Sequence, residues 1–302
     1  MAFPAGAHGG DGARLAAWLG IAPDDVLDLS ASLNPVAPDP GPAVSRQLAA
    51  IGRYPDPGQA TTALADAMGV DPDWLLLCNG GAEAIALVAA ELGPGWIDEP
   101  DFSLYRRYLP GVIAGGPRWR SNPHSPSGRL AGPEEQAAVW DEAFWPLATG
   151  TWTRGDAERG AVVVGSLTKL FACPGLRLGY LLCADGDRVA RLRLRQPQWA
   201  VNGLALGALP ELLSAADLPA WAARVGQLRL QLAALLGGHG LEVETTEANW
   251  VLVHRAGDLR DRLARSAVLV RDCASFGLAG TVRVAVPDEQ GLQRLEDALS
   301  RR

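Results

Sequence analysis

A single lysine, Lys169, stands among residues whose types suit the binding of a phosphorylated aldehyde. Ser166 and Thr168 precede it closely, and Arg177 follows in the same segment, GSLTKLFACPGLRLGY. A lysine amine forms an imine with an aldehyde, whereas hydroxyl groups and a guanidinium group bind phosphate. The pattern therefore predicts that pyridoxal 5′-phosphate (PLP) is bound as a Schiff base on Lys169, although a turn with hydroxyl caps is an alternative.

The composition gives this lysine further weight. Lys169 is the only lysine among 27 basic residues, and all the others are arginine. Arginine supplies charge on a protein surface, but its pKa above ~12 makes it a poor amine nucleophile. A stray surface lysine is the alternative, and the motif around Lys169 favours a chemical role.

A second candidate for phosphate binding is the segment NGGAEAI, where a predicted strand passes into a predicted helix. The free N–H groups of Gly81 and Ala82 at the start of that helix can receive a phosphate group. Many strand-to-helix turns contain glycine, so an ordinary turn is the alternative interpretation.

Three more residues have the types that a PLP ring requires. Asp141 follows an apolar run in WDEAF, and a buried carboxylate there can pair with the protonated pyridine nitrogen of PLP. Asn122 precedes a proline-rich loop and can donate to the phenolic oxygen, while Phe102 can stack on the ring. A helix cap or ion pair for Asp141, and core packing for Phe102, are the alternatives.

Two arginines late in the chain are candidates for substrate binding. Arg271 lies in LVRDC, and Arg283 lies in TVRVAV within an otherwise apolar strand. A bidentate clamp on a carboxylate is a natural use of a guanidinium group in that setting. A solvated strand face is the alternative for each.

The elements that must position these residues alternate between strand and helix, which predicts an α/β fold with a mostly parallel sheet in a large domain. Beyond about residue 203 the pattern changes to an α+β tail, a smaller C-terminal domain. We expect strands at 26–35, 74–80, 95–100, 137–141, 160–166, 176–183, 267–271 and 281–286, a pair of strands within 242–255, and helices at 12–20, 61–69, 81–92, 203–214, 218–237, 257–265 and 288–300.

Bulk properties exclude several classes of function. The net charge of −7 argues against a nucleic-acid partner, which would favour a basic protein. The longest apolar runs are far short of the ~20 residues that span a membrane, and the N-terminus does not resemble a signal peptide. The four cysteines form no CxxC pair, so we expect buried free thiols, no metal site and a cytoplasmic protein.

Taken together, these motifs resemble the fold-type I PLP enzymes, in the branch that holds histidinol-phosphate aminotransferase and the cobalamin-pathway threonine-phosphate decarboxylase. The resemblance covers nearly the whole chain and is greater to the decarboxylase than to the aminotransferase. The HGG segment and the phenylalanine of DEAF both favour the decarboxylase. The matching segments are HGG, LDLSASLNP, RYPD, NGGAEAI, DEAF, SLTKLFACPGLRLGY, QWAVN, EANWVLV and VRDC.

This resemblance implies a role for each candidate residue. Lys169 forms the imine, Asp141 pairs with the ring nitrogen, and Asn122 meets the ring oxygen. A small phosphorylated amino acid is the implied substrate, and a homodimer is implied because Tyr54 would reach the cofactor of the partner subunit. The implied phosphate ligands are Gly81, Ala82, Ser166 and Arg177, and the implied substrate contacts are His8, Gly9, Arg271 and Arg283.

The resemblance also implies a domain division: an N-terminal arm at 1–25 joining the small domain, a PLP-binding domain at 26–215 and a small domain at 216–302. Two departures accompany it. Ser32 stands where the family has a substrate-contacting asparagine, and the stretches from Tyr105 to Asn122 and from Gly128 to Asp141 are shorter than usual. A strand–helix unit is therefore expected to be trimmed.

Three functions follow from these observations. The first is decarboxylation of O-phospho-L-threonine to aminopropanol phosphate in cobalamin biosynthesis. The second is transamination of histidinol phosphate or a related amino acid. The third, motivated by the short segments, is a PLP-binding or partner-binding protein without catalysis. Lys169 is the expected proton shuttle for the second reaction.

Overall fold

The computed structural model describes residues 3, 4, 6 and 8–301, which form two compact units. The larger unit holds 37–125 and 130–222, and the smaller holds the described residues up to 36 together with 126–129 and 223–301. The sequence suggested boundaries at 25/26 and 215/216. The smaller unit thus includes the first strand, expected in the large domain, and a short piece of the loop after Asn122.

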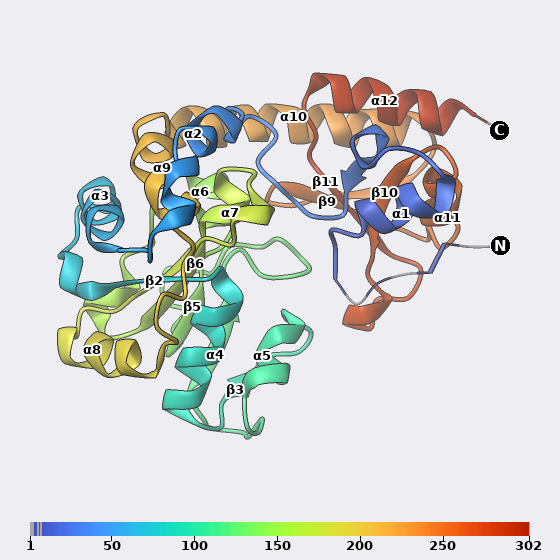
Figure 1. Cartoon of the computed structure of the whole chain (residues 1–302). Coiled ribbons are helices and arrows are strands. Elements are labelled where there is room, and N and C mark those ends of the chain that lie inside the picture. The colour runs from blue at the N-terminus through green and yellow to red at the C-terminus, as the bar shows by residue number, and fades with distance from the viewer. Residues whose placement is uncertain (1–2, 5, 7, 302) are drawn as a thin grey trace. The chain divides into compact units, whose positions relative to one another are not determined.

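The larger unit contains a six-stranded sheet in the order β2-β7-β6-β5-β4-β3. Figure 1 labels four of its strands, β2, β6, β5 and β3. The pairs β6–β5, β5–β4 and β4–β3 are parallel, whereas β2–β7 and β6–β7 are antiparallel. The sheet is therefore mixed, with a parallel majority. Its strands are β2 (Leu75–Cys78), β3 (Trp96–Ile97), β4 (Arg118–Ser121), β5 (Val139–Asp141), β6 (Val162–Ser166) and β7 (Gly179–Leu182).

Helices cover this sheet, so its central strands are apolar on both faces. Val162 and Val164 of β6 pack with Ile85 and Val88 of α4, and Val163 between them is also fully buried. The helices of this unit are α2 (Gly41–Ser45), α3 (Gly58–Met68), α4 (Gly81–Leu92), α5 (Ser103–Tyr108), α6 (Trp145–Thr149), α7 (Leu167–Leu170), α8 (Gly186–Arg195) and α9 (Gly203–Ser214), with the first part of α10 (Leu218–Gly238).

One edge of the sheet is short, in the region where the sequence led us to expect a trimmed strand–helix unit. The outermost strand, β3, has two residues, and beyond it Val112 makes an isolated parallel bridge to Gly95. The connection between the parallel strands β4 and β5 contains turns and no helix among its residues, all of which are described. Such a crossover normally carries a helix.

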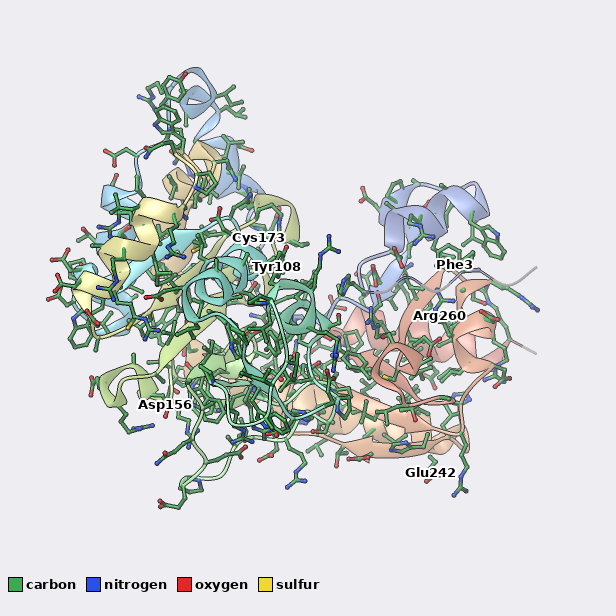
Figure 2. All side chains as sticks on the ribbon, turned by 90° about the horizontal axis from the view of Figure 1, so that it is seen from below. Phe3, Tyr108, Asp156, Cys173, Glu242 and Arg260 are labelled. Atoms are coloured by element: carbon green, nitrogen blue, oxygen red, sulfur yellow. The ribbon has the colours of Figure 1, made fainter. Side chains whose placement is uncertain are left out.

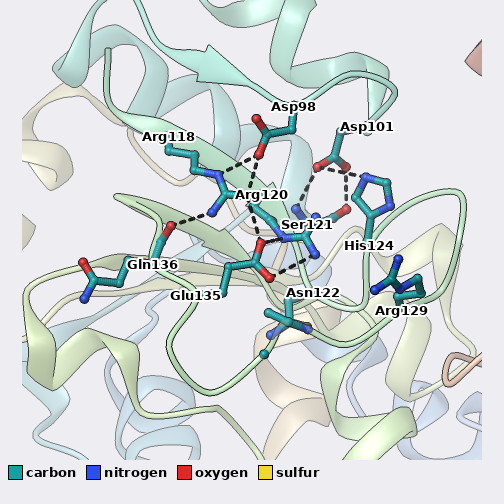
Figure 3. A network of polar contacts seen from close by, with 12 residues as sticks. Asp98, Asp101, Arg118, Arg120, Ser121, Asn122, His124, Arg129, Glu135 and Gln136 are labelled. Atoms are coloured by element: carbon teal, nitrogen blue, oxygen red, sulfur yellow. Dashed lines mark hydrogen bonds and ion pairs between the residues drawn. The ribbon is translucent and has the colours of Figure 1, made fainter. Parts of the chain in front are cut away.

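Ion pairs cover the part of β4 that lies along this connection (Figure 3). Arg118 contacts Asp98 at 2.5 Å and Glu135 at 2.8 Å, and Arg120 contacts Glu135 at 2.5 Å. Trp119 between the two arginines points to the other face and is buried. Arg118 and Arg120 thus occupy the face of β4 that no helix of the connection covers, whereas apolar residues there would need a covering helix.

The smaller unit contains a five-stranded sheet in the order β1-β10-β11-β9-β8, in which only β1–β10 is parallel. Its core joins β9, β10 and β11 to α10, α11 and α12. The elements are α1 (Gly12–Leu19), β1 (Leu27–Leu29), β8 (Glu242–Thr245), β9 (Trp250–His254), α11 (Leu259–Ala264), β10 (Val268–Asp272), β11 (Val282–Ala285) and α12 (Glu289–Ser300).

The N-terminal segment is fixed to this unit by Arg260 of α11. Its guanidinium donates to the carbonyl oxygen of Phe3 at 2.6 Å and lies 5.1 Å from the centre of the Phe3 ring (Figure 2). Phe3 in turn packs with Leu15 of α1. In the described part of the chain, no helix is long and apolar enough to cross a membrane.

Candidate active site

Lys169 lies where β6 passes into α7, at the carboxyl end of a buried strand. Its side chain is half-buried, and its charge interacts with the carboxylate of Asp141 at the end of the neighbouring strand β5. Ser166 and Thr168 flank this position with their hydroxyl oxygens 2.8 Å apart. The larger unit therefore brings the amine, the two hydroxyls and the carboxylate to one end of its sheet.

The beginning of α4 meets the same end of the sheet and forms a cradle with Arg177. Gly80 precedes α4 with φ 77°, and a Cβ atom there would lie 2.4 Å from a terminal guanidinium nitrogen of Arg177. A Cβ atom at Gly179 would lie 2.6 Å from the amide nitrogen of Gly81. Glycine at 80 and 179 thus allows β7, Arg177 and the helix start to approach closely.

This cradle can hold a phosphate group. The free N–H groups at the N-terminus of α4 include those of Gly81 and Ala82, both half-buried, and the helix dipole favours an anion there. Ser166 lies 3.6 Å from the position of a Cβ atom at Gly81, and Arg177 adds a positive charge. The four phosphate ligands named from the sequence therefore lie around one point.

Asp141 is held from two sides. Its Oδ1 accepts the backbone N–H of Ala143 at 3.0 Å, and its Oδ2 accepts the phenol of Tyr105 at 2.9 Å. Burial raises the pKa of Asp141, while these two hydrogen bonds and the charge of Lys169 act in the opposite direction. A cationic ring nitrogen would provide the carboxylate with the strong partner that a buried charge needs.

Asn122 carries a donor that suits the ring oxygen of PLP. Its backbone N–H donates to the Asp141 carbonyl at 2.8 Å, and its Oδ1 accepts the N–H of Ala131 at 3.0 Å. The Nδ2 atom is buried and makes no hydrogen bond to any residue that the structure describes. Buried amide donors are seldom left in that condition, so a ligand acceptor fits this position.

The two aromatic candidates of this unit lie in different settings. Phe102 is half-buried and makes an edge contact with Tyr105, with ring centres 5.7 Å apart. Tyr54 is 77% exposed, and its ring stacks on Trp199 at 4.3 Å. Stacking of Phe102 on the cofactor, and contact of Tyr54 with a partner subunit, stay predictions.

The remaining candidates lie in the smaller unit. His8 and Arg271 line one small cavity, together with Asp11 and Ser30. Gly9 is exposed, and the N–H of Gly10 beside it donates to the Ser30 hydroxyl at 2.8 Å.

Ser32 is fully buried with φ 50°, and its carbonyl oxygen accepts the Nδ2 hydrogen of Asn249 at 2.8 Å. The Ser32 hydroxyl makes no hydrogen bond to a described residue. Its contact with substrate, implied by the resemblance, stays a prediction.

Arg271 and Arg283 are directly opposite each other on β10 and β11. Both are buried; Arg271 lies over Phe276 and donates to Ser275, and Arg283 lies over the ring of Trp250. Burial lowers the pKa of both guanidinium groups, that of Arg283 to about 10. Two buried cations on paired positions favour an anionic ligand such as a carboxylate.

Three residues that support Asp141 escaped the sequence analysis. Tyr105 contacts Asp141 directly, and Asp101 and Ser121 form a buried hydrogen-bonded pair next to it. The sequence offered little indication of them, because Asp101 precedes and Tyr105 lies within a helix of only six residues. Ser121 ends a strand that contains two arginines and therefore lacks an apolar pattern.

The chain is similar to known enzymes over nearly its whole length. The family model for aminotransferases of class I and II matches residues 119–299. A threonine-phosphate decarboxylase of Salmonella typhimurium is 32% identical over 366 residues, covering 99% of this chain and 98% of that protein. A histidinol-phosphate aminotransferase of Dechloromonas aromatica is 27% identical over 340 residues, covering 95% and 93%.

The solved structures give the same fold. The histidinol-phosphate aminotransferase from Sinorhizobium meliloti, crystallised in complex with pyridoxal-5′-phosphate, has a TM-score of 0.81 at 16% identity and covers 95% of this chain and 92% of its own. The alignment with the Salmonella protein spans 366 positions although this chain has 302 residues, in keeping with the trimmed sheet edge.

Proposed function

Since this chain belongs to the class I and II aminotransferase family, we propose that it is a PLP-dependent decarboxylase of O-phospho-L-threonine that makes aminopropanol phosphate for cobalamin biosynthesis. One observation carries this choice: threonine-phosphate decarboxylases of two organisms are each 32% identical over nearly the whole chain, against 27–28% for histidinol-phosphate aminotransferases. The cofactor is PLP, linked to Lys169.

Bound PLP supplies an electron sink for the pair of electrons left when the carboxylate departs. Asp141 keeps the proton on the ring nitrogen, and Asn122 donates its Nδ2 hydrogen to the ring oxygen. The start of α4, Ser166 and Arg177 hold the phosphate and so fix the ring position. The amine of Lys169 would give a proton to the α-carbon of the substrate in place of the lost CO2.

Residues of the smaller unit hold the amino-acid substrate in this proposal. Arg271 and Arg283 bind its carboxylate or phosphate, and His8, Gly9 and Ser32 complete the contacts. These residues would set the orientation in which the α-carbon of the substrate is presented to the bound cofactor. The grip of these residues therefore selects between decarboxylation and transamination.

The proposed assembly is a homodimer, and the proposed location is the cytoplasm. Tyr54 supports the first, because its exposed ring, next to exposed Leu48 and Ile51 in the chain, suits contact with a second copy. The four cysteines, all free and buried, suit a reducing compartment.

The test supplies O-phospho-L-threonine and, separately, histidinol phosphate with 2-oxoglutarate. The proposal expects CO2 and aminopropanol phosphate from the first, without glutamate from the second, and Lys169→Ala as the control without turnover. Glutamate formed from histidinol phosphate without CO2 release would replace the proposal with the aminotransferase, which the 27% identical relatives favour. Cofactor binding without either reaction would favour a non-catalytic protein.

A further inference from the structure

A second buried carboxyl group, Asp101, lies close to Asp141 and takes no part in the proposed reaction. Asp101 accepts the backbone N–H groups of Phe102 at 2.6 Å and Ser121 at 3.1 Å. It also forms a hydrogen bond with the Ser121 hydroxyl (Figure 3). Ser121 and Asp141 occupy paired positions at the ends of β4 and β5. Two carboxyl groups are thus buried at the same end of the sheet.

Tyr105 stands between these two groups. It is fully buried, donates to Oδ2 of Asp141 at 2.9 Å and also interacts with the Ser121 hydroxyl. Burial and, to a smaller extent, repulsion from Asp141 raise the pKa of Asp101, and burial together with both carboxylates raises the pKa of the Tyr105 phenol. The order Asp101, Ser121, Tyr105, Asp141 is therefore a continuous chain of interacting polar groups.

The hydrogens of this chain can be counted. Ser121 has one hydroxyl hydrogen, and its oxygen also accepts the N–H of Ser125 at 2.7 Å. If Asp101 is ionised, it takes the Ser121 hydrogen and leaves Tyr105 without a donor from that side. If Asp101 is protonated, it donates to Ser121, Ser121 donates to Tyr105, and Tyr105 donates to Asp141. Only the second arrangement aligns every donor toward Asp141.

We propose that Tyr105 and Asp101 are positioning residues for Asp141: Asp101 stays protonated and, through Ser121 and Tyr105, holds Asp141 ionised and oriented toward the cofactor. Two carboxylates this deep repel each other, so one of them takes up a proton. The ring nitrogen and Lys169 attract the negative charge to Asp141. This inference rests on the proposed pairing of Asp141 with the ring nitrogen.

The other charged groups near Asp101 agree with a neutral acid there. Burial raises the pKa of Asp101 to about 7, against opposing hydrogen bonds from Ser121 and Phe102. His124 lies 4.0 Å from Asp101, but burial and the charge of Arg120 lower its pKa to about 4. A neutral His124 gives Asp101 no positive charge, so the influences from described residues that favour the ionised form of Asp101 are its hydrogen bonds with Ser121 and Phe102.

The experiment measures the dissociation constant of PLP, by absorbance titration of cofactor-free protein, and the pH dependence of the cofactor spectrum. Tyr105→Phe keeps the ring and removes the hydrogen bond to Asp141, so we expect PLP affinity to fall about tenfold or more. Asp101→Asn imitates the protonated acid, so we expect affinity within about threefold of the parent and the loss of any spectral titration near pH 7.

Tyr108→Phe is the matched control, because Tyr108 lies on the same helix and is 37% exposed (Figure 2). Asp141→Asn tests the assignment on which the inference rests. If Asp141→Asn leaves affinity and spectrum unchanged, the proposed role of Asp141 fails.

If Asp141→Asn weakens binding but Tyr105→Phe behaves like Tyr108→Phe, the inference alone is wrong. It is also wrong if Asp101→Asn weakens binding as much as Asp141→Asn. Circular dichroism and the unfolding temperature of each cofactor-free variant separate these outcomes from misfolding, and the double variant Tyr105→Phe/Asp141→Asn should be no weaker than Asp141→Asn.

Discussion

Replacing Asn122 by alanine removes two atoms with different partners, so its effects on stability and on cofactor binding can be separated. Oδ1 accepts the N–H of Ala131 within the protein, whereas the buried Nδ2 makes no hydrogen bond to a described residue. We therefore expect Asn122→Ala to lower PLP affinity strongly and to change the stability of the cofactor-free protein little.

The magnitudes follow from the partners of each atom. A hydrogen bond to the charged ring oxygen is worth about 1.5–3 kcal/mol, which corresponds to a loss of PLP affinity of roughly 10- to 100-fold. In the cofactor-free protein, losing the Ala131 bond costs about 1 kcal/mol, and removing a buried donor without a partner returns a similar amount. The unfolding temperature should therefore stay within about 3 °C of the parent.

Asn202→Ala is the matched control, because both side-chain atoms of Asn202 have partners in the larger unit. Its Oδ1 accepts the N–H of Ala205 as the cap of α9 at 2.9 Å, and its Nδ2 donates to the Leu176 carbonyl at 2.8 Å. Loss of the cap and the second bond should cost about 2 kcal/mol and lower the unfolding temperature by several degrees.

The assays are thermal unfolding of cofactor-free protein and absorbance titration with PLP. The expected pattern is a large affinity loss without destabilisation for Asn122→Ala, and destabilisation with a smaller affinity loss for Asn202→Ala. Unchanged PLP affinity in Asn122→Ala would refute the reasoning, because the buried Nδ2 would then have no role toward the cofactor.

Three further predictions concern charged groups. Lys169→Arg should bind no PLP covalently, so that borohydride treatment labels the parent and not the variant. Burial raises the pKa of Glu142 from 4.5 to about 7, so between these pH values the folded protein holds a proton that the unfolded chain releases. The free energy of unfolding should therefore fall by up to about 3 kcal/mol as the pH rises through this range. Thermal unfolding at pH 5 and 8 would measure this fall, which should be smaller in Glu142→Gln. Arg283→Met should weaken the binding of O-phospho-L-threonine at least tenfold in a binding titration, because it removes one of the two proposed anion-binding guanidinium groups.

The sequence predicted those elements whose burial pattern is visible in a short window. The apolar run of β6, the glycine pair before α4 and the alternating strands of the smaller unit lie within a few residues of their predicted positions. These segments are apolar because both faces, or one whole face, are covered.

Elements with polar surroundings were not predicted. The sequence of β4 is Arg-Trp-Arg-Ser, and its arginines pair with Asp98 and Glu135 from other segments. No local sequence pattern predicts these ion pairs. The helices α5 and α8 carry several arginines and few buried residues. The sequence therefore pointed to Lys169, Asp141 and Asn122 as candidates, but it could not point to Tyr105, whose proposed role depends on a contact between α5 and β5.

The trimming of the sheet leaves the candidate site intact, which bears on whether the chain is still an enzyme. The shortened parts are the edge at β3 and the connection between β4 and β5, whereas Asp141, Lys169 and Gly81 lie at the ends of β5 and β6 and at the start of α4. Asn122 lies at the first residue of the shortened connection and is fully buried. A buried donor without a protein partner, such as Nδ2 of Asn122, costs about 1–3 kcal/mol in the free protein. Two buried cations on paired positions, Arg271 and Arg283, add a further cost. A protein that had lost its ligands would gain stability by replacing these groups with apolar ones, so their presence favours a chain that still binds a cofactor and an anionic substrate.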